Sequence, residues 1–235
     1  MNTASEVIAE GSYNYLQKNK LYSTENFKLS RRFESQAYFF EAEILSRIET
    51  GEFLKVKVYY ELTSSMMPVV MRIEKSLGQR YSLETFEVKS ASNELYYEFS
   101  NEEDSKSLVK HHSTKHYLSS PAVCTSAVFS LTKKFDSTGR TPITLVVGHN
   151  SWRTDEAAPL ETVVYADFNN RETVDLEIGG QKLSANCLSL YNDDSLSSHI
   201  QGDRVDLMLS KHFSIPYQLR EKNMRVDINF LKRMD

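Results

Sequence analysis

Polar and apolar residues alternate along much of this chain, and the alternation is cleanest between residues 54 and 63. The even-numbered positions from Leu54 to Leu62 are apolar or aromatic, while the odd-numbered positions from Lys55 to Thr63 are charged or carry a hydroxyl group. Side chains of a strand point to opposite faces in turn, so this pattern places one face in a core and the other in water. It is typical of an antiparallel sheet and not of a doubly wound parallel sheet.

The same period-two pattern recurs, more weakly, along most of the chain. It predicts strands over 6–16, 21–32, 38–48, 69–74, 81–88, 94–99, 143–147, 160–168, 172–178, 182–191, 205–209 and 226–230. Residues 108–117 read as an edge strand or a loop. Thr50-Gly51-Glu52 and Gly179-Gly180 predict hairpin turns, and Asn169-Asn170 predicts a tight turn. Short strands at this spacing indicate a sandwich or a barrel.

One segment has helical spacing instead. Ser120 is a good N-cap, and Pro121 suits the first helical position. The apolar residues that recur at helical spacing, and would form one stripe, are Cys124, Ala127, Val128, Leu131 and Phe135. We therefore expect one helix, from Pro121 to Phe135, packed on the concave face of the sheet.

These elements predict an all-β fold, mainly antiparallel. We expect a long curved sheet that forms an open or half-closed barrel covered by one α-helix. The chain has 235 residues and neither a linker nor a clear repeat, so residues 1–235 are expected to form a single β-rich domain.

The amino-acid composition favours a β-rich protein that neither binds nucleic acid nor spans a membrane. The 13 Tyr and 12 Phe residues favour β structure, and the formal net charge of −4 leaves no basic excess for phosphates, so we expect no nucleic-acid partner. No apolar run reaches 18 residues, so we expect no membrane span. Residues 1–6 do not resemble a signal peptide. This predicts a cytoplasmic protein, or a periplasmic one if an export signal has been removed.

The two cysteines, Cys124 and Cys187, lie in apolar contexts, one on the predicted helix and one in a predicted strand. Two cysteines do not make a disulfide framework in a chain of this length. We expect two buried free thiols, with a single disulfide between helix and sheet as the alternative.

Candidate catalytic and metal-binding residues are few. His111, His112 and His116 lack a zinc-ligand spacing, so we expect solvated histidines, no metal and no cofactor. His149 lies at a strand end close to Trp152 and could act as a general base, with Asp155 or Tyr165 assisting. His149 is thus the one weak catalytic candidate.

Large aromatic side chains recur on successive predicted strands. In a closed, packed barrel they would form the core, and in an open curved sheet they would line a cavity for an apolar ligand. The residues expected to contact such a ligand are Tyr38, Phe40, Tyr60, Tyr97, Phe99, Val128, Leu131 and Trp152.

Three short segments of the C-terminal half carry a family resemblance: 126–131 (SAVFSL), 176–182 (LEIGGQK) and 205–210 (VDLMLS), the last followed by Ile215-Pro216. In this order they resemble uncharacterised exported bacterial domains that are similar to the periplasmic lipoprotein carriers. That resemblance implies an unclosed barrel with a helix over its mouth. It implies no catalytic residues, and the N-terminal half shares only the rhythm of strands.

Three functions remain open at this point. The first is a non-enzymatic binder or carrier of a lipid-like or other apolar ligand, with the helix as a lid. The second is an enzyme that uses the same cavity, with His149 as the base. The third is a structural or interaction protein whose exposed β edges pair with a protein partner.

Overall fold

The structure is a computed structural model that describes residues 4–103, 105–111, 117–136, 140–148, 159–178, 180–192 and 204–234. Its fifteen strands form one sheet. The strands are β1 (Ser5–Gln17), β2 (Lys20–Arg32), β3 (Tyr38–Arg47), β4 (Phe53–Leu62), β5 (Pro68–Leu77), β6 (Arg80–Lys89), β7 (Glu94–Asn101), β8 (Ser105–His111), β9 (Tyr117–Ser119), β10 (Thr141–Val147), β11 (Leu160–Ile178), β12 (Gln181–Tyr191), β13 (Arg204–Leu209), β14 (Pro216–Glu221) and β15 (Met224–Arg233).

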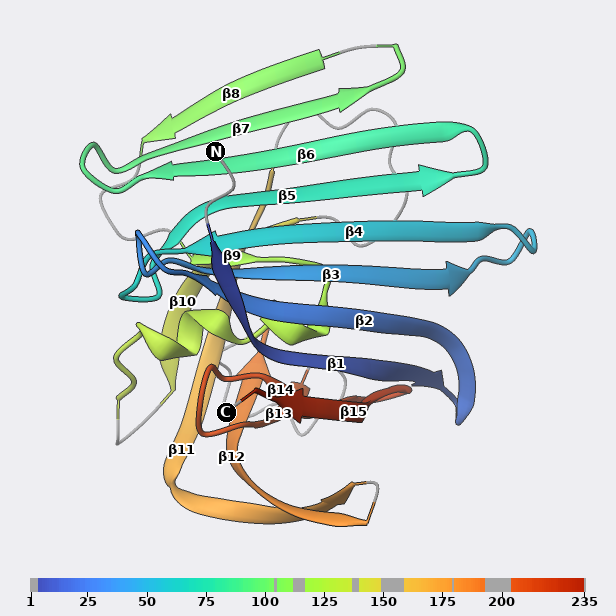
Figure 1. Ribbon diagram of the computed structural model, residues 1–235, viewed down its shortest axis with the longest axis vertical. Helices are drawn as coiled ribbons and strands as arrows, with labels where there is room; N and C mark the ends of the chain where they lie inside the picture. The colour runs from blue at the N-terminus through green and yellow to red at the C-terminus, as the bar shows by residue number, and fades with distance from the viewer. Residues whose placement is uncertain are drawn as a thin grey trace.

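The sheet is built from two meanders that meet in its middle. Its strand order is β8-β7-β6-β5-β4-β3-β2-β1-β15-β14-β13-β12-β11-β10-β9, so β1 and β15 pair with each other. Among the described strands, β9 and β10 are the one parallel pair, and the other pairs are antiparallel. In Figure 1 the blue-to-green strands β1–β8 are stacked as a ladder, and the yellow and orange strands β10–β12 run steeply across it. The predicted all-β, mainly antiparallel fold is confirmed.

The sheet curls until its β9 end lies against the inner face of β4 and β5. The Tyr60 hydroxyl on β4 donates a hydrogen bond of 3.3 Å to the carbonyl oxygen of Leu118 on β9. Gly148, just after β10, lies so close to β5 that a Cβ there would be 2.0 Å from Cδ1 of Ile73. These contacts make the sheet a half-closed barrel, with β8 and β9 as its two edge strands. Pairing of either edge with a protein partner stays a prediction.

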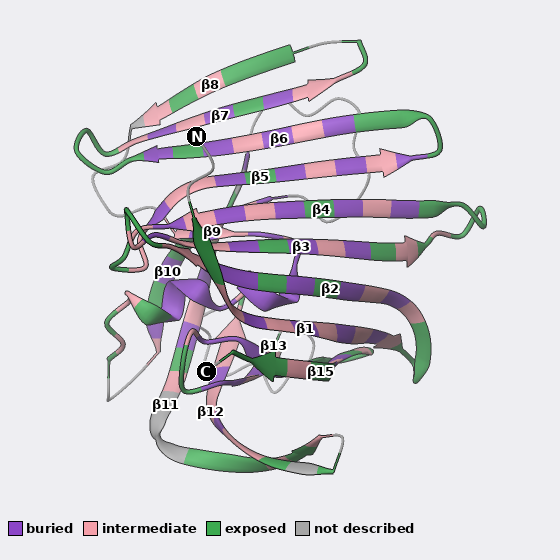
Figure 2. Ribbon diagram, viewed as in Figure 1, coloured by how far each residue is buried: buried purple, intermediate pink, exposed green. Residues whose placement is uncertain are grey.

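Alternating burial follows the predicted pattern. In β4 the even-numbered residues from Leu54 to Leu62 are at most 6% exposed, and they face the interior. Figure 2 shows the same alternation of buried and more exposed positions along β3 to β6. Burial of these apolar side chains is the main force that holds the curled sheet, at about 25 cal/mol per Å² of apolar surface.

The predicted helix lies in the expected place, but it is not one α-helix from Pro121 to Phe135. The segment forms two short 3₁₀ helices, η1 (Val123–Thr125) and η2 (Val128–Leu131). Residues 122–125 and 127–130 are buried, so the segment has no solvent-facing side of the kind that an amphipathic helix shows. Its backbone is instead fixed by hydrogen bonds to distant side chains, described below. No helix among the described residues is long and apolar enough to cross a membrane.

Two further elements differ from the prediction. Asn169 and Asn170 do not form a tight turn, because β11 runs on to Ile178. Its pairing with β12 shifts register between Asn169 and Thr173, so extra residues on β11 form an irregularity that bends a strand without ending it. The hairpin between Ile178 and Gln181 is present as predicted. The three-residue strand β9 was not predicted, since it is too short to show a periodic pattern.

Candidate ligand pocket

Most of the predicted ligand contacts are core residues. Five are at most 3% exposed and belong to the hydrophobic core: Phe40, Tyr60, Tyr97, Phe99 and Val128. Tyr38 packs partly buried against Phe213, with ring centroids 5.4 Å apart, and Leu131 is 36% exposed. Trp152 lies outside the described residues. None of the described seven lines the hollows presented below, and their contact with a ligand stays a prediction.

The predicted catalytic group falls mostly outside the part of the chain that the structure describes. His149 and Asp155 lie there, as do His112 and His116. Tyr165 is half-buried on β11, opposite Tyr191 of β12. The described residues therefore provide no active-site geometry for the hypothesis that the protein is an enzyme with His149 as the base.

Both cysteines are free thiols in the structure, and the alternative of a disulfide between them is wrong. Cys124 is buried, as predicted. Cys187 is only half-buried, because it is the neighbour of the fully buried Leu188 on β12 and so points to the opposite face of the sheet. Its Sγ is 3.4 Å from Sδ of Met208. Burial raises the pKa of the Cys124 thiol well above its ordinary value, and the neighbouring Glu25 raises it further. This thiol is a core group and not a nucleophile.

A buried carboxylate fastens the helical segment inside the barrel. Glu25 on β2 is fully buried and accepts hydrogen bonds from the backbone N–H groups of Val123, at 2.8 Å, and Cys124, at 3.0 Å. The Tyr15 hydroxyl on β1 also donates to Glu25. These bonds satisfy the first N–H groups of η1, which have no partner within the helix. The segment is thus seated in the sheet and does not have the form of a loose lid.

Burial raises the pKa of the Glu25 carboxyl above its ordinary value of 4.5, and the hydrogen bonds from Tyr15, Cys124 and Val123 offset part of this rise. A raised pKa means that the folded state holds the proton more tightly than the unfolded state. The contribution of this proton to stability is complete below pH 4.5 and is lost as the pH rises through the folded-state pKa.

Glu25→Gln is therefore expected to change the pH dependence of stability. Relative to the variant, the wild type should lose free energy of unfolding as the pH rises above 4.5, because the variant has no proton to release at this site. Urea unfolding at several pH values from 4 upward measures the difference. A difference between wild type and variant that stays constant over this range would contradict the argument.

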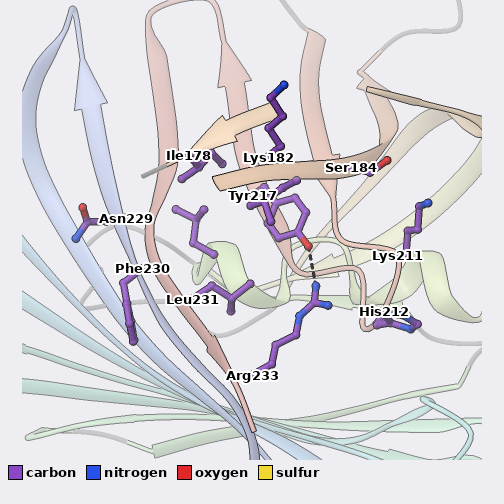
Figure 3. Close-up of a pocket in the computed structure, with 12 residues that line it drawn as sticks. Ile178, Lys182, Ser184, Lys211, His212, Tyr217, Asn229, Phe230, Leu231 and Arg233 are labelled. Atoms are coloured by element: carbon purple, nitrogen blue, oxygen red, sulfur yellow. Dashed lines mark hydrogen bonds between the residues drawn. The ribbon is translucent and has the colours of Figure 1, made fainter. Parts of the chain in front are cut away.

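The hollow best suited to a ligand lies near the C-terminal end of the described chain. We call it the C-terminal pocket; its volume is about 610 Å³, and it opens between the far end of the β11–β12 hairpin, the loop after β13, and strands β14 and β15. Figure 3 shows its side chains. They are Ile178, Lys182, Leu183, Ser184, Lys211, His212, Tyr217, Ile228, Asn229, Phe230, Leu231 and Arg233.

The pocket has an apolar side and a polar side. In Figure 3, Ile178, Phe230 and Leu231 lie on one side of the view, where Asn229 is the one labelled polar side chain, while Ser184, Lys211 and His212 gather on the other. Tyr217 and Arg233 lie between them, and the Arg233 guanidinium donates a hydrogen bond of 2.7 Å to the Tyr217 hydroxyl. Such a site can bury an apolar group and hold a polar one at the same time.

The loop that carries Lys211 and His212 is held firmly. Across its base, the N–H of Ser210 donates to the carbonyl oxygen of Ile215 at 2.8 Å, and the N–H of Ile215 donates to Oγ of Ser210 at 3.0 Å. Phe213 and Ser214 have φ values of 62° and 49°, in the left-handed region that few non-glycine residues adopt. Backbone strain of this kind persists only where the surroundings impose it, and it gathers at functional sites.

Two adjoining features complete the site. Oγ of Ser130 in η2 donates to Oγ of Ser214 at 2.8 Å, which ties the loop to the buried helical segment. A second hollow of about 180 Å³, which we call the small pocket, shares His212, Leu231 and Arg233 with the C-terminal pocket. Its remaining lining residues are Ile8, Ala9, Ser210, Phe213, Ile215 and Met234, and most of them are apolar.

Another hollow, of about 720 Å³, lies on the outer face of β2 to β5. It is lined by four cations and four carboxylates, and two of these cations pair with lining carboxylates on other strands. Arg32 pairs with Glu61, and Nζ of Lys57 lies 3.9 Å from Glu74. The Tyr59 hydroxyl accepts from Arg32 at 2.8 Å and donates to Glu61 at 2.7 Å. With its charges balanced in this way, the surface shows the ordinary solvated face of a sheet.

Sequence reasoning selected none of the residues that line the C-terminal pocket. The sequence did contain a signal for this site. Lys211 and His212 follow the predicted strand 205–209 after one serine and precede Ile215-Pro216, so two cationic or titratable groups lie in a short loop at a strand end. Loops on a rigid scaffold often carry binding residues. The pattern did not show which other elements this loop would meet.

Comparisons with known proteins show the fold but no family. No family model matches the chain, and no curated protein matches it. Among solved structures, it is similar to a β-barrel-like protein of domain of unknown function DUF1849 from Brucella abortus, with a TM-score of 0.60 and 10% sequence identity. The likeness covers 97% of this chain and 98% of that one, so the whole open barrel is shared. The predicted likeness to an uncharacterised open-barrel domain is confirmed at the level of fold.

Proposed function

We propose that this protein binds a lipid-like or other apolar small molecule without transforming it, and that the ligand occupies the C-terminal pocket. The observation that carries the proposal is an open hollow of about 610 Å³ with one apolar wall and a few polar groups at its rim. Ligand sites for small molecules have volumes of roughly 300 to 1,000 Å³ and this kind of lining.

The energetics of the pocket suit an alkyl chain or a compact apolar group. The apolar wall includes Ile178, Leu183, Phe230 and Leu231, and Phe230 is 50% exposed. Covering such surface is favourable by about 25 cal/mol per Å², or about 0.8 kcal/mol for each CH₂ group removed from water. Part of this gain is offset by the loss of motion on binding.

The proposal gives the buried helical segment the role of a support. Its resemblance to the helix of the lipoprotein carriers led us to expect a lid over the concave face. Instead, Glu25 fastens η1 to the sheet, and Ser130 of η2 contacts Ser214 in the loop of the pocket. The ligand would bind beside the C-terminal strands, on a scaffold that the segment stiffens.

A binding experiment with a blocking variant tests the proposal. Native mass spectrometry of the purified protein is expected to detect a bound apolar molecule, and a fluorescent fatty-acid probe is expected to bind with a Kd in the micromolar range, roughly −8 kcal/mol. Ser184→Trp places a large ring at the pocket wall and is expected to weaken probe binding by at least about tenfold.

Thr173→Trp is the matched control. Thr173 is exposed on the same β11–β12 hairpin but does not line the pocket, so this variant should bind the probe as the wild type does. Equal binding by the wild type and Ser184→Trp would show that any ligand binds elsewhere. Absence of probe binding and of a co-purified molecule would remove the basis of the proposal.

A further inference from the structure

We infer that the ligand of the C-terminal pocket is an anionic amphiphile, a single alkyl chain that ends in a carboxylate or a phosphate. The inference rests on the proposed function and names the chemical class of its ligand. It comes from the charges of the lining residues, which the proposal itself does not use.

Each charged side chain of the lining is basic. Lys182 from β12, Lys211 from the loop after β13 and Arg233 from β15 come from three separate elements, and His212 adds a fourth nitrogen-bearing group. Among the lining residues that the structure describes, none is Asp or Glu. The whole chain has a formal net charge of −4, so the pocket reverses the sign of the protein's overall charge. A concave site of one sign attracts ligands of the opposite sign.

Arg233 is placed to receive a planar or tetrahedral anion. Its Nη2 donates to the hydroxyl of Tyr217 at 2.7 Å, and Tyr217 is buried, so this bond orients the exposed guanidinium between the apolar and the polar side of the pocket. A guanidinium has five N–H donors, and this bond uses one of them. The fork that remains matches the two oxygens of a carboxylate or a phosphate.

The position of the head group follows from the two hollows. His212 and Arg233 line both the C-terminal pocket and the small pocket, so they stand where the two meet. Lys211 neighbours His212 in a loop whose base is closed by the hydrogen bonds of Ser210 and Ile215. An anion at this junction would meet groups that are already in place, which lowers the entropic cost of binding.

The alkyl chain would extend away from this junction along the apolar side. Ile178 and Phe230 lie across the pocket from Lys211 and His212 in Figure 3, and Leu231, which lines both hollows, adds an apolar side chain at the junction itself. One side of the pocket thus offers cationic groups for the anionic head group of an amphiphile, and the opposite side offers apolar side chains for its alkyl chain. A neutral apolar molecule would leave the cations of the rim unused, and a cationic one would be repelled by them.

Four probes with the same ten-carbon chain test the inference: decanoate, decyl phosphate, decanol and decyltrimethylammonium. Displacement of the fluorescent fatty-acid probe gives the affinity of each. Decanoate or decyl phosphate is expected to bind at least about tenfold more tightly than decanol, since a charge-assisted hydrogen bond adds this much. Decyltrimethylammonium is expected to bind more weakly than decanol, and added salt should weaken the anions alone.

The double variant Arg233→Gln with Lys211→Gln is expected to weaken the binding of the anionic probes by about tenfold or more and to leave decanol unchanged. The control, Lys232→Gln with Lys222→Gln, removes the same charge from β15 and a nearby turn, outside the pocket, and should bind like the wild type. Lys211 is exposed, so Lys211→Gln alone repeats the test with little risk to folding, and a thermal unfolding curve checks each variant.

The outcomes separate the inference from the proposed function. Equal affinity for decanoate, decyl phosphate and decanol, with no effect of the double variant, would overturn the anionic head group and leave the apolar binder intact. Binding of none of the four probes would overturn both. Preference for decanoate over decyl phosphate, or the reverse, would identify which of the two head groups the site selects, and either preference supports the inference.

Discussion

Replacing Lys75 by Met is expected to lower the free energy of unfolding by about 3–5 kcal/mol, since removing one partner of a buried ion pair leaves the other charge without it. Lys75 on β5 and Glu84 on β6 are 2% and 1% exposed, and their Nζ and Oε2 atoms are 3.1 Å apart. The hydroxyl of Tyr97 on β7 donates to Oε1 of the same glutamate at 3.2 Å. The ion pair and the Tyr97 hydroxyl together join three neighbouring strands on the inner face of the sheet.

Chemical denaturation of three variants measures this effect. The double variant Lys75→Met with Glu84→Leu should recover most of the loss, because two apolar side chains can replace a buried pair at little cost. Lys57→Met is the surface control on β4, where Nζ is 3.9 Å from the carboxylate of Glu74, a side chain that is 46% exposed, and it should cost less than about 1 kcal/mol. A loss in Lys75→Met as small as that of Lys57→Met would show that the buried pair does not stabilise the sheet.

The second large effect is expected at Glu25. Glu25→Leu should lower the free energy of unfolding by about 3 kcal/mol, because three buried donors lose their acceptor and each unsatisfied donor costs about 1–3 kcal/mol. The donors are the N–H groups of Val123 and Cys124 and the hydroxyl of Tyr15. Relief of the buried carboxylate offsets only part of this loss.

Hydrogen exchange shows which part of the chain Glu25→Leu destabilises. The amides of Val123 and Cys124 should exchange faster in Glu25→Leu at the same pH, while amides in the middle of β4 keep their protection relative to global unfolding. Glu43→Leu is the control, since the side chain of Glu43 on the next strand is 46% exposed and its carboxylate pairs with Lys55 at 2.8 Å. If η1 stays protected in Glu25→Leu, the contacts of its apolar residues suffice to seat it.

The alternation of apolar and polar residues predicted the strands well, because side chains of a strand are buried with period two regardless of which strand lies beside it. The residues from Leu54 to Leu62 showed this before any partner was known. The helical segment shows where local pattern is insufficient. Its apolar spacing predicted a helix in the right place, but it did not predict that Glu25, which lies 98 residues before Val123, accepts hydrogen bonds from the backbone of the segment. No local signal joins these two positions.

The C-terminal pocket was beyond prediction for the same reason. Lys182, Lys211 and Arg233 line the same pocket because β12, β13, β14 and β15 are neighbours in the sheet. The alternation of polar and apolar residues within each strand does not reveal the order of the strands. Of the aromatic residues expected on successive strands, Phe40, Tyr60, Tyr97 and Phe99 are buried, whereas Tyr38 is half-buried and Tyr81 is exposed. Whether such groups enclose a cavity or fill it depends on how tightly the sheet curls, and here Phe40, Tyr60 and Tyr97 belong to the packed core.

The pairing of β1 with β15 has a consequence for how the protein folds during its synthesis on the ribosome. Strands β1 to β8 can assemble as soon as they have been synthesised, but β1 then presents one unpaired side until residues 224–233 have emerged. An exposed strand side of 13 residues is a template for association with other chains. The two meanders close into one sheet only when the C-terminal strand arrives, so the seam between β1 and β15 is where we expect slow maturation and aggregation to compete.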